Sequence, residues 1–479
     1  MVFSSITFLF LFLPVVLLIY FLSPTRLKNH VLLAASLIFY AWGEKVFVLV
    51  MVVSILVNYA SALLIERFRE RKRDRVVLIV SLVANLGLLV AFKYANFLAD
   101  NLNILLRLVG ATTITLQPIH LPIGISFFTF HAISYVVDVY RKEVKADPNP
   151  AGIALYITLF SQLVAGPILR YHEVAGQIAR RFVVLDDFAE GVRRFIVGFG
   201  KKMLIANTLA LPADEIFGLP PNTLTVSVAW LGAICYALQL YFDFSGYSDM
   251  AIGLGRMFGF KFNENFNYPY VSQSVTEFWR RWHISLSSWF RDYLYIPLGG
   301  NRYSTARTYG NLVFVFFVCG LWHGASWSFI VWGLFHGLLL VVERVALGDW
   351  LKRSWPIVRH AYLILVVLIG WVFFRAENLS RAASYLSAMF GFVPVTAAAT
   401  KLALYLNSET VVMLLVGTLA SLPIFPKVQA LMATERWKKL TTIQPALELA
   451  RLGLYLGIFS IAVLWLASGT HNPFIYFRF

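Results

Sequence analysis

Cysteine and charge are both scarce in this sequence. Of its 479 residues only two are cysteine and 14% are charged, whereas an ordinary soluble domain is about 25% charged. Cys235 and Cys319 each lie in an apolar stretch, so neither a disulfide framework nor a structural zinc site is expected. Disordered chains combine few apolar residues with a high net charge, whereas this chain has many apolar residues and few charged ones. The composition therefore excludes a disulfide-rich secreted domain and a disordered or rod-like chain.

Apolar residues make up 59% of the chain, and the mean hydropathy is +0.71. This excess of apolar surface needs lipid, so we predict an all-α polytopic membrane protein. We expect about 10–11 transmembrane helices together with re-entrant and interfacial helices, because several apolar runs are shorter than a full crossing of roughly 20 residues. The candidate spans are residues 1–24, 31–43, 46–64, 76–92, 119–137, 203–211, 224–242, 309–321, 325–342, 361–374, 409–424 and 450–467.

The chain is expected to form one integral membrane domain over residues 1–479. Within it we distinguish N-terminal spans in 1–150, a central region with re-entrant segments in 151–345 and C-terminal spans in 346–479. The pair Gly166-Pro167 predicts a break in the central region that would suit a re-entrant turn.

The charged residues are unequal in sign, with 41 Lys and Arg against 25 Asp and Glu. In a membrane protein such a surplus is typical of cytoplasmic loops, and residues 66–75 carry six basic and three acidic side chains between two apolar runs. Alternation of loops then predicts an outside N-terminus, inside positions for 66–75 and 141–145, and an outside position for 214–215. The basic stretch 170–202 is expected to be cytoplasmic and partly an amphipathic surface helix. No nucleic-acid-binding module accompanies the charge.

Polar side chains are concentrated between residues 242 and 324, where the chain is otherwise apolar. Such groups are costly at membrane depth, so by default they indicate a functional site. Residues 274–293 are predicted to form one helix, because Ser274 and Glu277 have the spacing of a capping box. His283 would then lie on the aromatic, apolar face of that helix.

The pattern leaves two interpretations of His283: it is either a packed histidine or a site residue that faces a cavity. The neighbouring Arg280 and Arg281 would attract anionic phosphates, or anchor the chain at lipid headgroups. Both alternatives remain open at the level of sequence.

His323 ends an apolar run just before the next span. A neutral imidazole kept from bulk water there could act as a general base toward a hydroxyl or thiol during acyl transfer, and a structural histidine is the other interpretation. His336 would lie roughly 140° round a helix from His323, so the two are not expected to form a dyad. His131 is more typical of a core residue.

Three carboxylates, Asp138, Asp243 and Asp249, lie in or near apolar segments and could bind a proton or a cation. For Asp138 a salt bridge at the end of a span is the favoured interpretation. No nucleophile elbow, zinc-binding helix motif or P-loop occurs in the sequence, so no metal site is predicted.

Two strings in the polar region, EFWRRWHISLSSWFRDYLYIPLGGNR and LWHGASWSFIVWGLFHG, closely resemble the membrane-bound O-acyltransferase family, and within it the bacterial alginate O-acetylation branch. Further likeness is found along most of the chain. It is carried by the MVFSS start, LPIGISFFTFHAISYVVDVYR, LFSQLVAGPILRY, YFDFSGYSDMAIGLGRMFGF, WVFFRAENL and the NPFIYFRF ending.

The resemblance implies an O-acyltransferase of the bacterial cytoplasmic membrane, with helices around a central funnel or tunnel. It implies that His323 is the catalytic histidine and His283 a second, polar site residue. Acetyl-CoA is then the donor substrate, without a resident cofactor, and Arg280 and Arg281 are candidates for holding its phosphates. The implied partners are a periplasmic or extracellular acetyltransferase of the serine-hydrolase type and the machinery that makes the polysaccharide.

Two alternatives belong to other classes of protein. In the first, the chain is a transporter or channel whose polar region conducts a solute or protons, with His323 as a gating group. In the second, it is a scaffold subunit that only positions a partner enzyme. The acetylated polymer is also open, because alginate, other exopolysaccharides, cellulose and peptidoglycan are all acceptors of similar chains.

Overall fold

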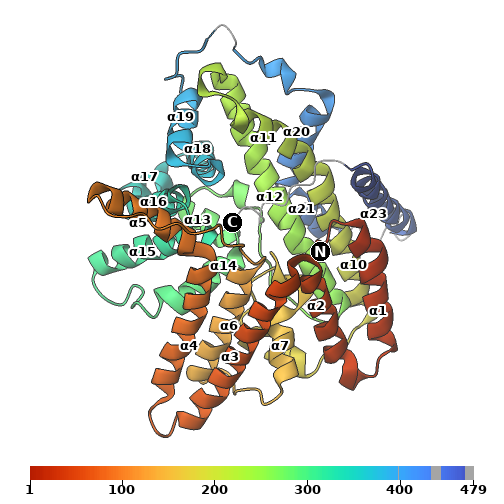
Figure 1. The fold of residues 1–479 in the computed structure, drawn as a ribbon. Helices are drawn as coiled ribbons and strands as arrows, with labels where there is room; N and C mark the ends of the chain where they lie inside the picture. The colour runs from red at the N-terminus through yellow and green to blue at the C-terminus, as the bar shows by residue number, and fades with distance from the viewer. Residues whose placement is uncertain (397–398, 433–443, 470–479) are drawn as a thin grey trace.

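The computed structural model describes residues 1–396, 399–432 and 444–469, and every regular element in these ranges is a helix (Figure 1). Six helical stretches in them are long and apolar enough to cross a membrane, namely Thr25–Phe68, Asp74–Leu108, Val226–Met257, Trp327–Arg353, Pro356–Arg375 and Pro445–Ala467. Three shorter apolar helices accompany them, at Phe8–Leu22, Ile125–Tyr140 and Ser408–Ala420. The all-α, multi-pass membrane fold is thereby confirmed, while the total of ten or eleven crossings stays a prediction. The NPFIYFRF ending lies outside the described residues.

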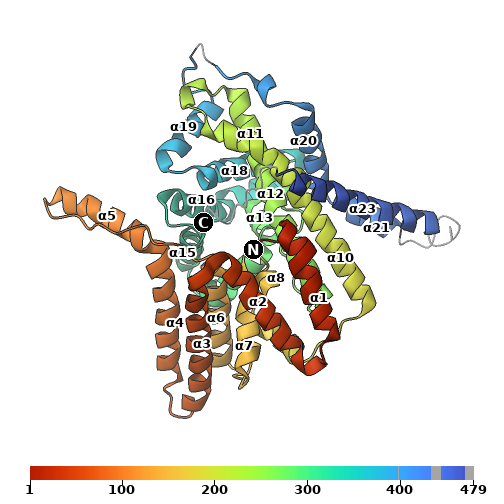
Figure 2. The same cartoon turned by 45° about the vertical axis from the view of Figure 1, so that its right-hand side comes forward.

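The N-terminal helices stand beside one another in the lower half of Figure 1. They are α1 (Leu13–Leu22), α2 (Lys28–Glu44), α3 (Val48–Phe68), α4 (Asp74–Leu89), α6 (Ile125–Tyr140) and α7 (Pro150–Thr158). The predicted split between the second and third spans is confirmed, because α2 ends at Glu44, Lys45 has a positive φ of 46°, and α3 starts at Val48. The amphipathic α5 (Ala95–Leu108) projects sideways from the body in both ribbon views (Figures 1 and 2).

The long helix α12 (Val226–Met257) runs through the centre and packs along α10 (Leu185–Gly200). Glycines bring the two backbones together: a Cβ atom on Gly198 would lie 2.5 Å from the carbonyl oxygen of Gly246. Small residues allow this close packing in membrane proteins. Helix α10 is amphipathic, as predicted, because its buried residues include Phe195 and Phe199 while its charged residues lie outside this set. Its glycines pack against α12, so it does not lie alone at the surface.

A buried break replaces a simple crossing after α7. Helix α7 ends at Thr158, the four-residue α8 (Phe160–Leu163) follows, and the chain is not helical at Gly166-Pro167. Nearly every side chain of this segment is buried, which agrees with the predicted re-entrant turn, because irregular backbone at membrane depth must be covered by protein.

The remaining helices complete the shell around α12. They are α9 (Tyr171–Ala179), α11 (Asn207–Gly218), α13 (Val275–Arg281), α14 (Ile284–Phe290), α15 (Thr305–His323), α16 (Trp327–Val342), α17 (Gly348–Arg353), α18 (Pro356–Arg375), α19 (Leu379–Met389), α20 (Ser408–Ala420), α21 (Ile424–Met432) and α23 (Gln444–Ala467).

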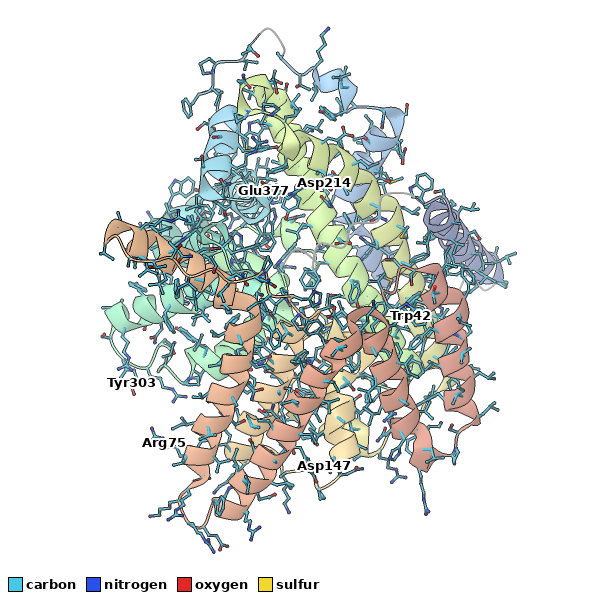
Figure 3. All side chains as sticks on the ribbon, viewed as in Figure 1. Trp42, Arg75, Asp147, Asp214, Tyr303 and Glu377 are labelled. Carbon is cyan, nitrogen blue, oxygen red and sulfur yellow. The ribbon has the colours of Figure 1, made fainter. Side chains whose placement is uncertain are left out.

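The charged loops lie at two opposite ends of the molecule, in the grouping that their charges predict. Arg75 and Asp147 lie near one end, and Asp214 and Glu377 lie toward the other (Figure 3). The basic loop 66–75 and the loop after α6 thus share an end, with Asp214 opposite. Which end faces the cytoplasm stays a prediction.

Candidate active site

The prediction of a single helix over residues 274–293 is wrong, because two short helices occupy most of this range. Ser274 does cap the helix, because its hydroxyl accepts a hydrogen bond from the amide of Glu277 at 3.0 Å. However, α13 ends at Arg281, His283 has a left-handed backbone with φ of 44° and ψ of 55°, and α14 starts only at Ile284. His283 therefore does not share a helix face with the aromatic residues of α13. It stands at a corner between two short helices.

At this corner His283 is almost completely buried, with 1% of its surface exposed. Its Nδ1 atom lies 3.1 Å from the side-chain oxygen of Asn265. The ring of Phe244, on α12, meets the imidazole edge-on at a centroid distance of 4.6 Å. The Nε2 atom of His283 has no hydrogen-bond partner among the described residues. Sequence reasoning missed Asn265, whose only signal was an amide side chain inside the polar region.

His323 is the last residue of α15 and is 6% exposed. The chain turns to an extended conformation at Gly324, so the imidazole lies at a helix end and not along a helix face. Three aromatic rings surround it, from Trp322, Trp332 and Phe374, at centroid distances of 4.9, 5.0 and 5.1 Å. The histidine is thus held in a mostly apolar setting, as a base kept from bulk water requires.

The fold brings His283 and His323 to the same aromatic residue. The ring of Trp322 lies 6.2 Å from the imidazole of His283 and 4.9 Å from that of His323. His336 lies behind Trp332, whose ring is 5.0 Å from the imidazole of His323 and 5.4 Å from that of His336, and His336 lines neither hollow near His323. The fully buried His131 packs beside Tyr156 at 5.4 Å. The pairing of His283 with His323 near Trp322 is a tertiary feature, because the two histidines are 40 positions apart in the sequence.

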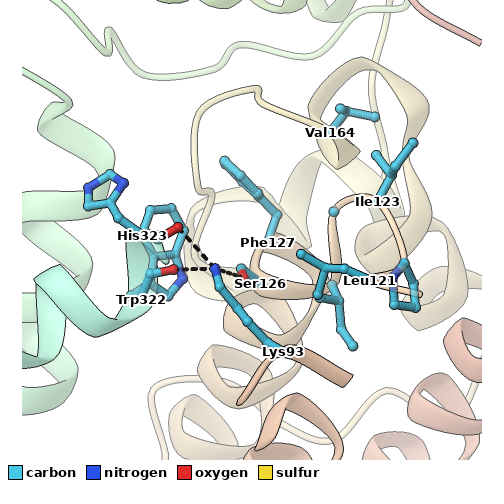
Figure 4. Close-up of a pocket in the computed structure, with 11 residues that line it drawn as sticks. Lys93, Leu121, Ile123, Ser126, Phe127, Val164, Trp322 and His323 are labelled. Carbon is cyan, nitrogen blue, oxygen red and sulfur yellow. Dashed lines mark hydrogen bonds between the residues drawn. The ribbon is translucent and has the colours of Figure 1, made fainter. Parts of the chain in front are cut away.

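Lys93 binds the helix end that carries His323 (Figure 4). Its ammonium lies 2.5 Å from the carbonyl oxygen of Trp322, 3.3 Å from that of His323 and 3.1 Å from the hydroxyl of Ser126. The next residue, Tyr94, donates to the carbonyl of Leu321 at 2.6 Å. The last carbonyls of a helix lack partners within the helix, and these two side chains supply them. Lys93 was not predicted; a lysine directly after an apolar run was the available signal.

Two hollows meet near this helix end. The smaller one, of about 90 Å³, is lined by His323, Trp322, Lys93 and the chain around Gly124. The larger one, of about 1310 Å³, extends from Gly324 to Asp214 and Glu377. Lys93 lines both. The larger hollow therefore leads from the neighbourhood of His323 toward the end of the molecule opposite Arg75 (Figure 3).

Comparison with known proteins places this arrangement in a family. A family model described as MBOAT, membrane-bound O-acyltransferase family, matches residues 123–380. The chain is 50% identical over 393 residues to the probable alginate O-acetylase of Azotobacter vinelandii, covering 82% of this chain and 78% of the relative. It is 51% identical to that of Pseudomonas aeruginosa, covering 82% and 75%. Identity to the peptidoglycan O-acetyltransferase of Helicobacter pylori is 38%, covering 82% and 80%.

The chain belongs to the membrane-bound O-acyltransferase family. It is therefore an O-acyltransferase, and this membership argues against the transporter and scaffold alternatives. The matched range contains both histidines, Lys93 lies before it, and the large hollow is lined mainly from within it.

The two arginines proposed to hold phosphates differ in their surroundings in this acyltransferase. Arg281 pairs with Glu277 at 2.9 Å and donates to the backbone oxygen of Asn267 at 3.1 Å. Arg280 is exposed, and the described residues offer it no ion pair or hydrogen bond. Arg280 is thus the better placed of the two to meet an anion.

The carboxylates of the acyltransferase are held in ion pairs. Asp243 pairs with Lys202 at 2.6 Å between almost fully buried side chains. Asp249 pairs with Lys201 at 2.7 Å and with Arg194 at 2.9 Å. These pairs join α12 to α10 and to the π-helical segment Lys201–Ala206 that follows it, so these carboxylates hold the helices together.

Asp138, at the end of α6, forms the salt bridge expected there, but with a histidine. Its carboxylate lies 2.9 Å from Nδ1 of His172 and 2.6 Å from the hydroxyl of Tyr293, and Glu143 lies 3.3 Å from the same His172 atom. Ligand atoms of Asp138, Glu143 and His172 fall within 4.8 Å of one another, a spacing that a metal ion could bridge. The contacts of these three side chains with one another and with Tyr293 are those of an ion-pair cluster. The hydrogen bond to Asp138 raises the pKa of His172, and its partial burial opposes that change.

Proposed function

We propose that this acyltransferase takes an acetyl group from cytoplasmic acetyl-CoA and passes it across the membrane for the O-acetylation of an exopolysaccharide, alginate. The observation that carries the proposal is the 50% and 51% identity, over 82% of the chain, to two proteins named probable alginate O-acetylase. The enzyme lies in the bacterial inner membrane with its N-terminus outside. A periplasmic or extracellular acetyltransferase of the serine-hydrolase type completes the transfer beside the polysaccharide synthesis machinery.

His323 is proposed as the general base of the transfer. The oxygen of an acceptor hydroxyl forms the new ester bond while the thioester C–S bond breaks. The proton of that hydroxyl passes to His323 and from there to the departing CoA thiolate. A positioned base contributes typically 10²–10⁴-fold to such a step, or about 3–5 kcal/mol. The aromatic surroundings of His323 support this role, because they shield the imidazole from competing water.

His283 is proposed to orient the thioester. Its Nδ1 atom faces the oxygen of Asn265, so the proton lies on Nδ1 and Nε2 carries the lone pair. Nε2 then accepts a hydrogen bond, for which an amide N–H of the pantetheine arm of CoA is a suitable donor. The alternative role for His283 is to stabilise the developing oxyanion. It is disfavoured, because Nε2 in this tautomer has no proton to donate.

The two hollows support a transfer between substrates that arrive from different directions. Lys93 lines both of them, and the large one leads to Asp214 and Glu377. With the basic loop 66–75 at the cytoplasmic end, the large hollow lies on the acceptor side. It is lined by Gly324, the residue next to His323, so an acceptor in it would lie close to the proposed base.

The test uses a bacterium whose alginate acetylation depends on this chain. The chain is deleted, variants are restored, and the acetyl ester content of the secreted alginate is measured by NMR, with membrane levels checked by immunoblot. His323→Ala should lower the ester content at least about 100-fold. His336→Gln alters another buried histidine, away from both hollows, and should keep most of it. Substantial acetylation by His323→Ala would refute the assignment.

The donor and the acceptor are tested in inside-out membrane vesicles from the same cells. Acetyl-CoA labelled in its acetyl group is added outside, and label is sought in polymer within the lumen. Labelled alginate that is absent with His323→Ala supports the proposal. Label only in peptidoglycan would replace alginate as the acceptor, an outcome that the relative named peptidoglycan O-acetyltransferase makes worth measuring.

A further inference from the structure

We infer that Asn265 is a positioning residue of the transfer site, which holds His283 in the one tautomer that leaves the Nε2 lone pair free for substrate. The inference rests on the role proposed for His283. Asn265 lies in the irregular segment between α12 and α13 and is 1% exposed. It precedes His283 by 18 residues.

Asn265 supplies the cap that α14 lacks. The His283 side chain makes no capping hydrogen bond at the start of this helix. Instead, the amide of Ile284 donates to the backbone oxygen of Asn265 at 2.9 Å, and the amide of Ser285 donates to its side-chain oxygen at 3.2 Å. The first amides of a helix need such acceptors. The left-handed backbone of His283, which costs roughly 1–2 kcal/mol, is stabilised by these contacts from a distant segment.

The direction of each hydrogen bond in this cluster is determined by groups that can only donate. The amide of Ile168, in the non-helical segment after Gly166-Pro167, donates to the Ser285 hydroxyl at 2.9 Å. That hydroxyl then gives its own proton to the Asn265 side-chain oxygen, also at 2.9 Å. The amide of Ser285 donates to the same oxygen. The atom of Asn265 that faces His283 is therefore its oxygen, which is an acceptor.

Nδ1 of His283 must accordingly be the protonated nitrogen. It lies 3.1 Å from this oxygen, and a neutral imidazole has only one N–H. The nitrogen of the Asn265 amide is occupied as well, because it donates to the hydroxyl of Ser248 on α12 at 3.0 Å. The amide is thus anchored at both ends and cannot flip without losing several bonds. Nε2 of His283, buried and without a partner among the described residues, is left as an acceptor.

The first test reads the tautomer directly in the full-length protein in lipid. The nine histidines are labelled with ¹⁵N, and the His283 signals are assigned by their loss in His283→Gln. We expect the Nδ1–H form in the parent protein. A parent spectrum in which His283 carries its proton on Nε2 would overturn the inference, whatever the variants do.

The second test compares variants at Asn265 by alginate acetylation and by kcat and KM for acetyl-CoA. Asn265→Leu removes the acceptor and should lower kcat at least about 30-fold, with loss of the Nδ1–H signal. Asn265→Asp keeps an acceptor oxygen and should recover most of that kcat and the signal. Ser248→Ala breaks only the outer anchor, so kcat should change less than about 3-fold.

Two outcomes separate this inference from the proposed function. Full acetylation by His283→Gln would refute the role proposed for His283. Loss of acetylation in His283→Gln together with full kcat in Asn265→Leu would overturn the role of Asn265 alone. If Asn265→Leu is not recovered in the membrane, full kcat in Asn265→Asp with the Nδ1–H signal of His283 absent from that variant would likewise overturn it, because the tautomer would then not matter for the transfer.

Discussion

Lys93 shows how a single side chain can stabilise a functional helix end. All three protons of its ammonium have acceptors, which are two carbonyl oxygens at the end of α15 and the hydroxyl of Ser126. The N–H groups that it donates also complement the partial negative charge of the carbonyls at the C-terminal end of the helix. His323 is the last residue of that helix, so its position depends on Lys93.

Replacing Lys93 by Met should therefore weaken both the fold and the reaction. The buried carbonyls would lose their donor, at a cost of about 1–3 kcal/mol for each unsatisfied group. We expect a lower melting temperature in detergent and alginate acetylation reduced at least about 10-fold. Tyr94→Phe is the matched control, because it removes one neutral hydrogen bond at the same helix end and should cost less. Parental acetylation by Lys93→Met would contradict this account.

Arg280 and Arg281 should affect donor binding unequally. Because Arg281 is already paired with Glu277 and Arg280 is exposed, Arg280→Gln should raise the KM for acetyl-CoA several-fold with little change in kcat. Uniform loss of binding has this kinetic signature. Arg281→Gln should raise KM less. The measurement is acetyl transfer at varied acetyl-CoA; a lower kcat with unchanged KM in Arg280→Gln would disprove the phosphate contact.

At the scale of the helices, the contact between α10 and α12 is too close to accept a larger side chain. Helices α10 and α12 touch at glycines, and a Cβ atom on Gly198 would come within 2.5 Å of one backbone atom and 2.7 Å of another. Backbone atoms cannot move aside as a flexible side chain can, so the helices would have to separate. Their separation would also stretch the ion pairs of Asp249 with Lys201 and Arg194.

Gly198→Ala should accordingly destabilise the protein by about 1–3 kcal/mol, the usual cost of overpacking. A thermal unfolding curve in detergent would show this as a lower midpoint. Gly87→Ala is the matched control, because this glycine is also helical, in α4, but has nothing within 4 Å of an added Cβ. It should be neutral or slightly stabilising. Equal effects of the two substitutions would argue against the close packing of α10 and α12.

The contact of α6 with α9 should depend on pH through His172. Its pKa is raised by the hydrogen bond to Asp138; Glu173 adds to the rise, while partial burial and Arg170 oppose it. A raised folded-state pKa means that the stabilisation is fully present below the ordinary value of about 6.5 and is lost as pH rises through the folded value.

The melting temperature should therefore fall as pH increases above about 6.5. His172→Gln removes the titrating group and should flatten this part of the profile. The check is a series of thermal unfolding curves in one detergent between pH 5.5 and pH 8.5. An unchanged slope in His172→Gln would exclude His172 as the source.

At the scale of the whole molecule, the two ends differ in the charged residues that they carry. Arg75, in the basic loop, and Glu377, beside the large hollow, lie toward opposite ends (Figure 3). The positive-inside rule assigns the end with Arg75 to the cytoplasm. The path from donor to acceptor proposed here depends on that assignment.

The assignment can be tested with a membrane-impermeant maleimide, because both natural cysteines are buried. Glu377→Cys should be labelled in cells whose outer membrane has been made permeable. Arg75→Cys should be labelled only in inside-out vesicles. The reverse pattern would invert the orientation and with it the direction of acetyl transfer.

The membrane character of this protein follows from local features of the chain. Its 59% apolar content requires lipid, and each predicted helix follows from a local run of side chains. His323 was also within reach, because a histidine at the end of an apolar run is a local signal. The break at Gly166-Pro167 was predictable for the same reason, since it depends on the residues at that point alone.

The surroundings of the two histidines depend on contacts between segments that lie far apart in the chain. The pattern of residues 274–293 favours one helix, and it fails at His283 because Asn265 and Ile168 supply competing hydrogen bonds from segments distant in sequence. Lys93 reaches the end of α15 across 230 residues. Helix periodicity reports which side chains share a face, and it contains no information about which distant acceptor a buried N–H will find.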